Sequence, residues 1–529
     1  MESDDQRFLS RWEREAITSM SSLSSPQSAF RRAKSWRPAW LLAVVASAAG
    51  CTAAGCTSTN DSASPEASTG EAASLSGVEL KLVVVDDPGL AEAVRLLRGE
   101  WQGSTGAKLE IVEQTSGELL GAAELTADAL IYPAECLGEL AERNWLAPIP
   151  KATLDDPQLA WPEIFEADKS RLATWGTEAY AIPFGSPVLT CCYRADLLKK
   201  LDRKPPETWA EYQALAEFLA DRSNLGDAAP ADGEPWFAAA EPLAEGWAGL
   251  TLLARAAPYA KHRNHYSTLF DMESMEPLIA KPPFVKALDE LLAAAKFGAT
   301  SKLDFGPEQA RQALARGQCA LALTWPAPAR SQELAQNGKS AGGVEAPLDL
   351  GFVELPGAGE VYNLGSQAWD KRRPEDNPHV PLLGVSGRLG SISRNSTKSE
   401  AAGHLLAWLS GPQWGQRVAT ASKATTLFRE SQLAAPAEWL DLNVEEPAAL
   451  QYAEAVQRSI SQEESLTVLR IPARQRYMAA LDQAVRQAVS GELESQAALD
   501  QAAETWRTIT AELGLEAQRQ AYHRDLGLR

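Results

Sequence analysis

The chain has 529 residues, of which 45% are hydrophobic and 23% charged, enough for two or three domains with a sizeable core. Fifty Lys and Arg residues against 70 Asp and Glu residues give a formal net charge of −20 at pH 7. This charge repels phosphate backbones and anionic lipid headgroups, so it argues against a nucleic-acid partner.

Residues 1–50 have the pattern of an export signal. Basic residues from Arg31 to Arg37 precede the apolar run Pro38–Gly50, which is too short to span a bilayer core. The run ends in an Ala-Ala-Gly-Cys motif that looks like a bacterial lipoprotein box. We therefore expect Cys51 to be the lipid-modified N-terminus, with Cys56 as the alternative. An ordinary N-terminal helix is the competing interpretation.

A Ser-, Ala- and Thr-rich stretch, residues 51–77, predicts a flexible tether before the globular part. Strands are expected over Val78–Val85, Lys108–Gln114 and Ala129–Tyr132, with a helical pattern after the first and the third of them. Strands that alternate with helices predict a parallel α/β sheet. Ligands of such sheets bind beyond the carboxyl ends of the strands, so the loops that follow these strands are candidate site loops.

The segment Trp175–Trp209 contains a strand-like path that is broken in the middle. Ala179–Pro183 and Val188–Tyr193 have extended character, and Gly185-Ser186-Pro187 supplies turn residues between them. Thr208 and Glu211 then form the pattern of a capping box, which predicts a helix running to about Arg222. This arrangement is what a crossover between two lobes requires.

The strings YAIPFG, YRADLL and PETWAEY in this segment resemble the maltose-binding-like group of bacterial extracellular solute-binding proteins, which feed ABC importers. Further matching strings are GQCALALTWP at Gly317–Pro326, LPG at Leu355–Gly357, GVSGRLGSIS at Gly384–Ser393 and TKSEAAGHLLAWL at Thr397–Leu409. The resemblance covers roughly residues 78–515.

The resemblance implies an α/β, periplasmic-binding-protein-like fold. Two lobes, each with a mainly parallel sheet flanked by helices, would be joined by crossover hinge segments. Lobe I would comprise residues 78–186 plus about 351–415, and lobe II residues 187–350 plus about 416–529. Such lobes close over a ligand by hinge bending.

Four cysteines lie in the globular part: Cys136, Cys191, Cys192 and Cys319. An exported chain meets an oxidising compartment, in which disulfides persist. The family layout places the strands at Val188–Tyr193 and Cys319–Thr324 in one lobe, so one of Cys191 or Cys192 is expected to bond Cys319. Buried thiols are the alternative.

Sequence patterns of catalytic sites are mostly absent. Gly338-Lys339-Ser340 imitates the end of a phosphate loop, but Glu333 occupies the position of a required glycine. His262 and His265 lack a His-Glu-x-x-His motif, and five histidines make a metal site hard to assemble. We therefore expect no enzyme activity, catalytic residue, metal or cofactor.

Aromatic residues at loop positions favour a sugar binder, because sugars combine apolar C–H faces with a rim of hydroxyls. Trp325 follows the strand Cys319–Thr324, and the resemblance aligns it with a position that often carries a stacking tryptophan. The weaker aromatic candidates are Tyr132, Trp247 and Tyr477. The candidates for polar contacts in loops are Ser116, Glu135, Ser186, Asn363 and Arg388.

The predicted function is that of a lipid-anchored solute-binding protein on the periplasmic or outer side of a bacterial membrane. It would deliver a small polar ligand, with a carbohydrate as the expected class, to the permease subunits of an ABC importer, and would touch the membrane only through its lipid. Alternatives are a receptor for polyamines or another small solute, a secreted enzyme that uses the cleft, and a structural or sensor lipoprotein.

Overall fold

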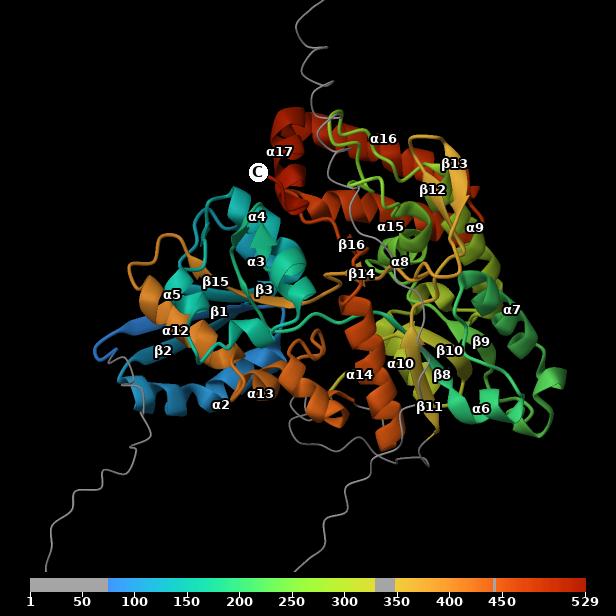
Figure 1. Cartoon of the computed structure of the whole chain (residues 1–529), viewed down its shortest axis with the longest axis horizontal. Helices are drawn as coiled ribbons and strands as arrows, with labels where there is room; N and C mark the ends of the chain where they lie inside the picture. Colours follow the sequence, from blue (N-terminus) through green and yellow to red (C-terminus); the bar gives the residue numbers. More distant parts are fainter. Residues whose placement is uncertain (1–74, 329–347, 441–443) are drawn as a thin grey trace, which may run out of the picture. The chain divides into compact units, whose positions relative to one another are not determined.

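The computed structural model describes residues 75–328, 348–440 and 444–529 (Figure 1). Every described residue belongs to one compact unit of the chain. The export signal, Cys51, Cys56 and the sequence Gly338-Lys339-Ser340 lie outside the described residues. None of the described helices combines the length and apolar character that a membrane span requires.

The first sheet has the strand order β2-β1-β3-β15-β4, with β7 also paired to β15. Its strands are β1 (Glu79–Val85), β2 (Lys108–Gln114), β3 (Ala129–Pro133), β4 (Leu146–Ala147), β7 (Ile182–Pro183) and β15 (Arg388–Ser393). β1 is parallel to both β2 and β3, whereas β15 is antiparallel to β3, β4 and β7. The run Leu82–Val85 is buried throughout, as expected for a strand covered on both faces.

Helices pack on this sheet because each has one apolar face. In α2 that face is Leu90, Val94, Leu97 and Trp101, all fully buried, and Asp87 caps the helix by accepting from the Leu90 N–H at 3.0 Å. The helices that accompany the first sheet in sequence are α2 (Pro88–Thr105), α3 (Ser116–Gly121), α4 (Leu137–Glu142), α5 (Lys151–Leu154), α12 (Ser399–Ser410) and α13 (Gly415–Ala419).

The second sheet has the strand order β11-β8-β10-β9. Its strands are β8 (Thr190–Arg194), β9 (Phe237–Ala240), β10 (Cys319–Thr324) and β11 (Leu350–Glu354). β8 is antiparallel to β10 and β11, and only β9 and β10 are parallel. Both sheets are therefore mixed, with parallel pairing confined to part of each, whereas the resemblance implied mainly parallel sheets.

The remaining elements are mostly helical. These helices are α6 (Ala195–Lys200), α7 (Trp209–Ala220), α8 (Ala248–Ala260), α9 (Pro282–Ala294), α10 (Pro307–Ala315), α14 (Glu446–Ile460), α15 (Arg474–Ser490), α16 (Ser495–Leu513) and α17 (Leu515–Asp525). Two-stranded pairs are formed by β5 (Thr174–Trp175) with β6 (Glu178–Ala179), β12 (Glu360–Asn363) with β13 (Ala368–Lys371), and β14 (Leu382–Leu383) with β16 (Leu466–Thr467).

The predicted crossover after β7 has the expected broken path. Gly185 (φ 101°) packs so closely against the Thr426 carbonyl that a side chain there would overlap it. Beyond β8, the Thr208 hydroxyl caps α7 by accepting from the Glu211 N–H at 3.3 Å. The return to the first sheet comes later than about residue 351, because β11 pairs with β8 and the next first-sheet strand begins at Arg388.

The expected disulfide between Cys319 and Cys191 or Cys192 is not formed, and Cys136, Cys191 and Cys319 are buried thiols. Strand register explains this, since Cys192 lies opposite Ala322 and Cys191 opposite Leu323. Cys319 is three residues beyond Ala322, roughly 10 Å along a strand that rises about 3.3 Å per residue. A disulfide needs Cα atoms within about 7 Å.

Candidate functional site

The loop after β1 is fastened to the start of β15 by Arg388. Its Nε donates to Asp87 Oδ2 at 2.8 Å and its Nη2 donates to the Asp86 carbonyl at 2.9 Å, while Nη1 donates to two further carbonyls of its own turn. Ser422 also donates to the Asp87 carboxylate. Arg388 is 5% exposed, so its donors are used inside the protein and it shapes the loop instead of projecting from it.

Ser116 lies beside this loop. It opens α3, after a capping box made by Thr115 and Glu118, and its backbone N–H donates to the Asp86 carboxylate at 3.1 Å. The side chain of Ser116 is half-buried. The carboxyl ends of β1 and β2 therefore meet at Asp86 and Ser116, as the parallel pairing requires.

Two oxygen atoms near Gly387 have no hydrogen-bond partner among the described residues. One is Oε2 of Glu135, in the turn after β3, and the other is the hydroxyl of Ser186, in the crossover; both atoms are buried. The Ala134 N–H donates to the Gly387 carbonyl at 2.9 Å. The Ser186 side chain lies so close to Gly387 that a side chain at position 387 would overlap it. Buried polar atoms are nearly always bonded, so each of these two oxygens can accept from a further donor such as a ligand hydroxyl or water.

Glu135 also makes one of the contacts between the two halves of the fold, which are built around the first and the second sheet. Its Oε1 lies 3.5 Å from Nη1 of Arg474, the first residue of α15. Both side chains are mostly buried, with 20% and 16% exposed. The ion pair thus joins the turn after β3 to a helix that packs with the second-sheet helix α8.

Trp325 and Trp247 form a pair at the end of β10. Their ring centroids are 5.6 Å apart with planes tilted by 48°. Trp325 is 5% exposed and its indole N–H donates to the Lys423 carbonyl at 3.0 Å, whereas Trp247, at the N-terminus of α8, is only half-buried. Trp247 is therefore the ring of the pair with a surface available to a ligand.

The segment Ser422-Lys423 links the two groups of predicted residues. Ser422 bonds Asp87 beside Arg388, and the carbonyl of Lys423 holds Trp325. The Lys423 ammonium lies 3.4 Å from Glu308 near the start of α10. Short contacts therefore run from the strand ends of the first sheet to the tryptophan pair of the second.

A model of the family described as "Bacterial extracellular solute-binding protein" matches residues 88–416, more than half of the chain. The chain belongs to this family. By sequence, the solute-binding protein has no match among curated proteins.

Solved structures similar to this solute-binding protein carry the same fold. A solute-binding protein from Agrobacterium radiobacter K84 in complex with ribitol has a TM-score of 0.60 at 17% identity, covering 82% of this chain and all of that one. Maltose-bound MalE3 of T. maritima gives 0.57 at 18% identity, covering 82% and 100%. The sugar-binding protein MalE of Xanthomonas citri gives 0.59 at 17% identity, covering 82% and 98%. The family and the α/β fold expected from the sequence are thus confirmed.

Two predicted aromatic residues of this solute-binding protein lie in the core. Tyr132 is fully buried in β3 and its hydroxyl bonds Ser391 at 2.7 Å. Tyr477 is fully buried in α15, bonds Thr510 at 2.9 Å and packs edge-on against Trp506. Their placement corrects the expectation of loop positions, because the first lies inside a strand covered on both faces and the second inside a helix packed on α16.

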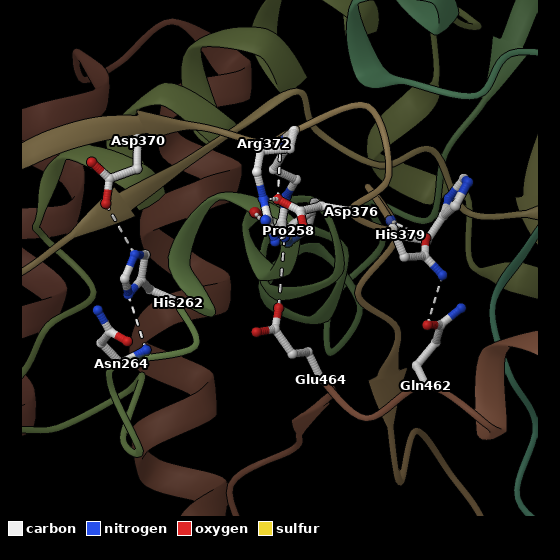
Figure 2. A network of polar contacts seen from close by, with 11 residues as sticks. Pro258, His262, Asn264, Asp370, Arg372, Asp376, His379, Gln462 and Glu464 are labelled. Atoms are coloured by element: carbon white, nitrogen blue, oxygen red, sulfur yellow. Dashed lines mark hydrogen bonds and ion pairs between the residues drawn. The ribbon is translucent and has the colours of Figure 1, made fainter. Parts of the chain in front are cut away.

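Asn363 is also separated from the other predicted site residues. It ends β12, where its amide donates to Asp370 Oδ2 at 3.1 Å and its Oδ1 contacts His265 Nε2 at 3.1 Å. The same Asp370 oxygen lies 3.1 Å from His262 Nε2, in the polar network shown in Figure 2. Asn363 therefore belongs to the hairpin of β12 and β13, whereas the sequence indicated only a loop there.

The sequence interpretation missed Arg474 and the segment Ser422-Lys423. These residues reach the site from parts of the chain far from their partners, so local sequence carries no signal for them. Within the described ranges, no group of three His, Cys, Asp or Glu side chains is arranged to hold a metal ion.

Proposed function

We propose that this protein binds a small polyhydroxylated ligand, a carbohydrate or polyol, and delivers it to an ABC importer. The observation that carries the proposal is the joint presence of the half-buried Trp247 ring, held by Trp325, and the unpartnered oxygens of Glu135 and Ser186. A ring face suits the C–H surface of a sugar, and fixed acceptors suit its hydroxyls.

The bound ligands of similar solved structures support the same class. Those proteins were solved with ribitol, D-mannitol, α-D-tagatose or maltose. All of these ligands are uncharged and rich in hydroxyls. An uncharged ligand also suits a chain with a net charge of −20, which would repel anions at long range.

We further propose that the protein acts outside the cytoplasm, held to the membrane by a lipid on Cys51. The basic cluster before Pro38, the apolar run and the Ala-Ala-Gly-Cys motif support this. Replacing Cys51 by Ser should abolish incorporation of a labelled fatty acid. Labelling that persists in Cys51→Ser would indicate that Cys56 carries the lipid instead.

The ligand class is tested by calorimetric titration of the full chain with ribitol, mannitol, maltose and spermidine. Saturable binding of a sugar or polyol that weakens at least about tenfold in Trp247→Ala is expected. Trp145→Ala, which removes a half-buried tryptophan beside β4, is the matched control and should bind as the unmodified protein does.

Two outcomes would contradict the proposal. Binding of spermidine, without binding of ribitol, mannitol or maltose, would indicate a polyamine receptor. A change in ligand mass after incubation would indicate turnover and therefore an enzyme.

A further inference from the structure

A cavity of about 440 Å³ lies away from the tryptophan pair and joins parts of both halves of the fold. One wall is the segment Ser170–Thr177, which includes β5, and a second is Lys261 and Tyr266, which follow α8. Ser465–Thr467, which includes β16, and the end of α17 complete the lining. A cavity of this size accommodates a small organic molecule.

Two cations in this cavity lack an acidic partner within ion-pair distance among the described residues. Arg171 is exposed and makes no salt bridge or side-chain hydrogen bond there. The Lys261 ammonium donates only to the Tyr266 carbonyl, at 3.0 Å. Burial lowers the pKa of Lys261, and the nearby positive charge of Arg171 lowers it further. Two cations that face one cavity repel each other, and an anion bound between them would offset that repulsion.

The carboxylates close to this cavity are engaged elsewhere. Asp525, which lines it, is paired with the buried Arg470, with Nε and Oδ1 2.7 Å apart. Glu464, whose negative charge acts on Lys261, faces the guanidinium of Arg372 with a 3.6 Å separation, as Figure 2 shows. Neither acid is therefore available to neutralise both cations.

Hydroxyl groups supply further donors in the same cavity. Thr268 and Ser465 are at most 7% exposed, and neither hydroxyl makes a hydrogen bond within the described part of the chain, nor does that of the half-buried Thr467. Oxyanions bind where cationic donors and hydroxyls converge.

We propose that this cavity is a second binding site, for a small oxyanion such as a phosphate or a carboxylate, with Arg171 and Lys261 as its charged contacts. The site is separate from the proposed sugar site, and it is positively charged within an acidic protein. An anion bound there would contact η3 (Asp168–Leu172) and β5 on one side and the loop after α8 on the other. It would therefore add a connection between the two halves of the fold.

In the test, inorganic phosphate is titrated into the full chain in the absence of sugar. Phosphate replaces sodium chloride stepwise, so that the ionic strength stays constant. We expect a saturable heat of binding and a rise in Tm for the unmodified protein. Arg171→Gln should weaken phosphate binding at least about tenfold, and Lys261→Met should do the same. Arg98→Gln, which removes an exposed arginine of α2, is the matched control and should leave binding unchanged.

Gluconate and sorbitol separate the possible sources of binding. Gluconate carries a carboxylate on a polyol chain and should compete with phosphate, whereas uncharged sorbitol should not. A response to phosphate that is equal in Arg171→Gln and Arg98→Gln, or that chloride reproduces, would overturn the proposal. Arg171→Gln should also leave ribitol or maltose affinity unchanged, so failure at this site is distinguishable from failure of the proposed sugar site.

Discussion

Glu135 and Arg474 face each other at 3.5 Å and connect the turn after β3 with the first residue of α15. The second carboxylate oxygen of Glu135 is buried and has no partner in the described structure. Glu135 can therefore hold the two halves together and offer an acceptor to a ligand at the same time.

Replacing Glu135 by Gln should weaken sugar or polyol binding about tenfold, because a neutral amide is a weaker acceptor than a carboxylate. The free energy of unfolding should change by no more than about 1 kcal/mol, since the ion pair is long. Calorimetric titration and urea unfolding measure the two quantities. Glu92→Gln, in a half-buried pair with Arg95 on α2, is the control. Unchanged affinity in Glu135→Gln would exclude a ligand contact.

The two tryptophans should respond differently to truncation. Trp325→Ala should lower the free energy of unfolding by about 3 kcal/mol, because the ring is buried and its N–H is bonded. Trp247→Ala should cost less stability and mainly lower ligand affinity, since this ring is only half-buried. Urea unfolding and calorimetry of both variants decide this. Equal losses of stability would show that the pair acts as one core unit.

Arg388→Met should destabilise the protein by about 3–5 kcal/mol, because it leaves Asp87 buried without its cation. The double variant Asp87→Asn, Arg388→Met should recover part of that loss. Urea unfolding of the single and double variants measures the coupling. A stable single variant with reduced sugar affinity would instead assign Arg388 to the ligand.

Asp168 predicts a pH dependence of stability. Burial raises the pKa of its carboxyl group from 3.8 to about 8, so the folded state keeps a proton that the unfolded chain has lost. Its contribution to stability is full below about pH 4 and is lost as pH rises through about 8. Asp168→Asn should therefore raise Tm more at pH 8 than at pH 5. An equal rise at both values would contradict the assignment.

The cysteines provide a redox prediction. Because Cys136, Cys191 and Cys319 are buried thiols, a reductant should leave the Tm of the protein unchanged. Burial also raises the pKa of Cys136 to about 12, so its thiol should react with alkylating reagents only after unfolding. A fall in Tm on reduction would indicate a disulfide and require a different register of β8 and β10.

Local patterns predicted the elements of this fold well, and long-range register less well. The strands β1, β2, β3 and β10 and the cap of α7 follow from short apolar runs and from a Thr-x-x-Glu motif. The predicted disulfide was wrong because no local signal fixes the register of β8 against β10. In the observed register Cys192 faces Ala322.

The candidate site was also predicted only in part, because the sequence carries local patterns but not long-range contacts. Glu135 follows a strand and Ser186 lies in a turn, as the sequence indicates, and Trp247 lies at the start of a helix; their contact with a ligand stays a prediction. Tyr132 and Tyr477 are core residues because both faces of their elements are covered, which a single sequence does not reveal. Arg474 was not predicted because its partner Glu135 lies far earlier in the chain, in the turn after β3.

The last helix has a consequence for how the protein folds. In α17, Arg524 makes two bonds of 2.7 and 2.6 Å to Glu142, which lies 382 residues earlier, and Arg470 is paired with Asp525. Contacts of such sequence separation form late and slow the search for the native state. A chain leaving the ribosome therefore lacks these contacts until Arg524 and Asp525 have been made, so the two halves of the fold stay without these ion pairs while most of the chain is already present.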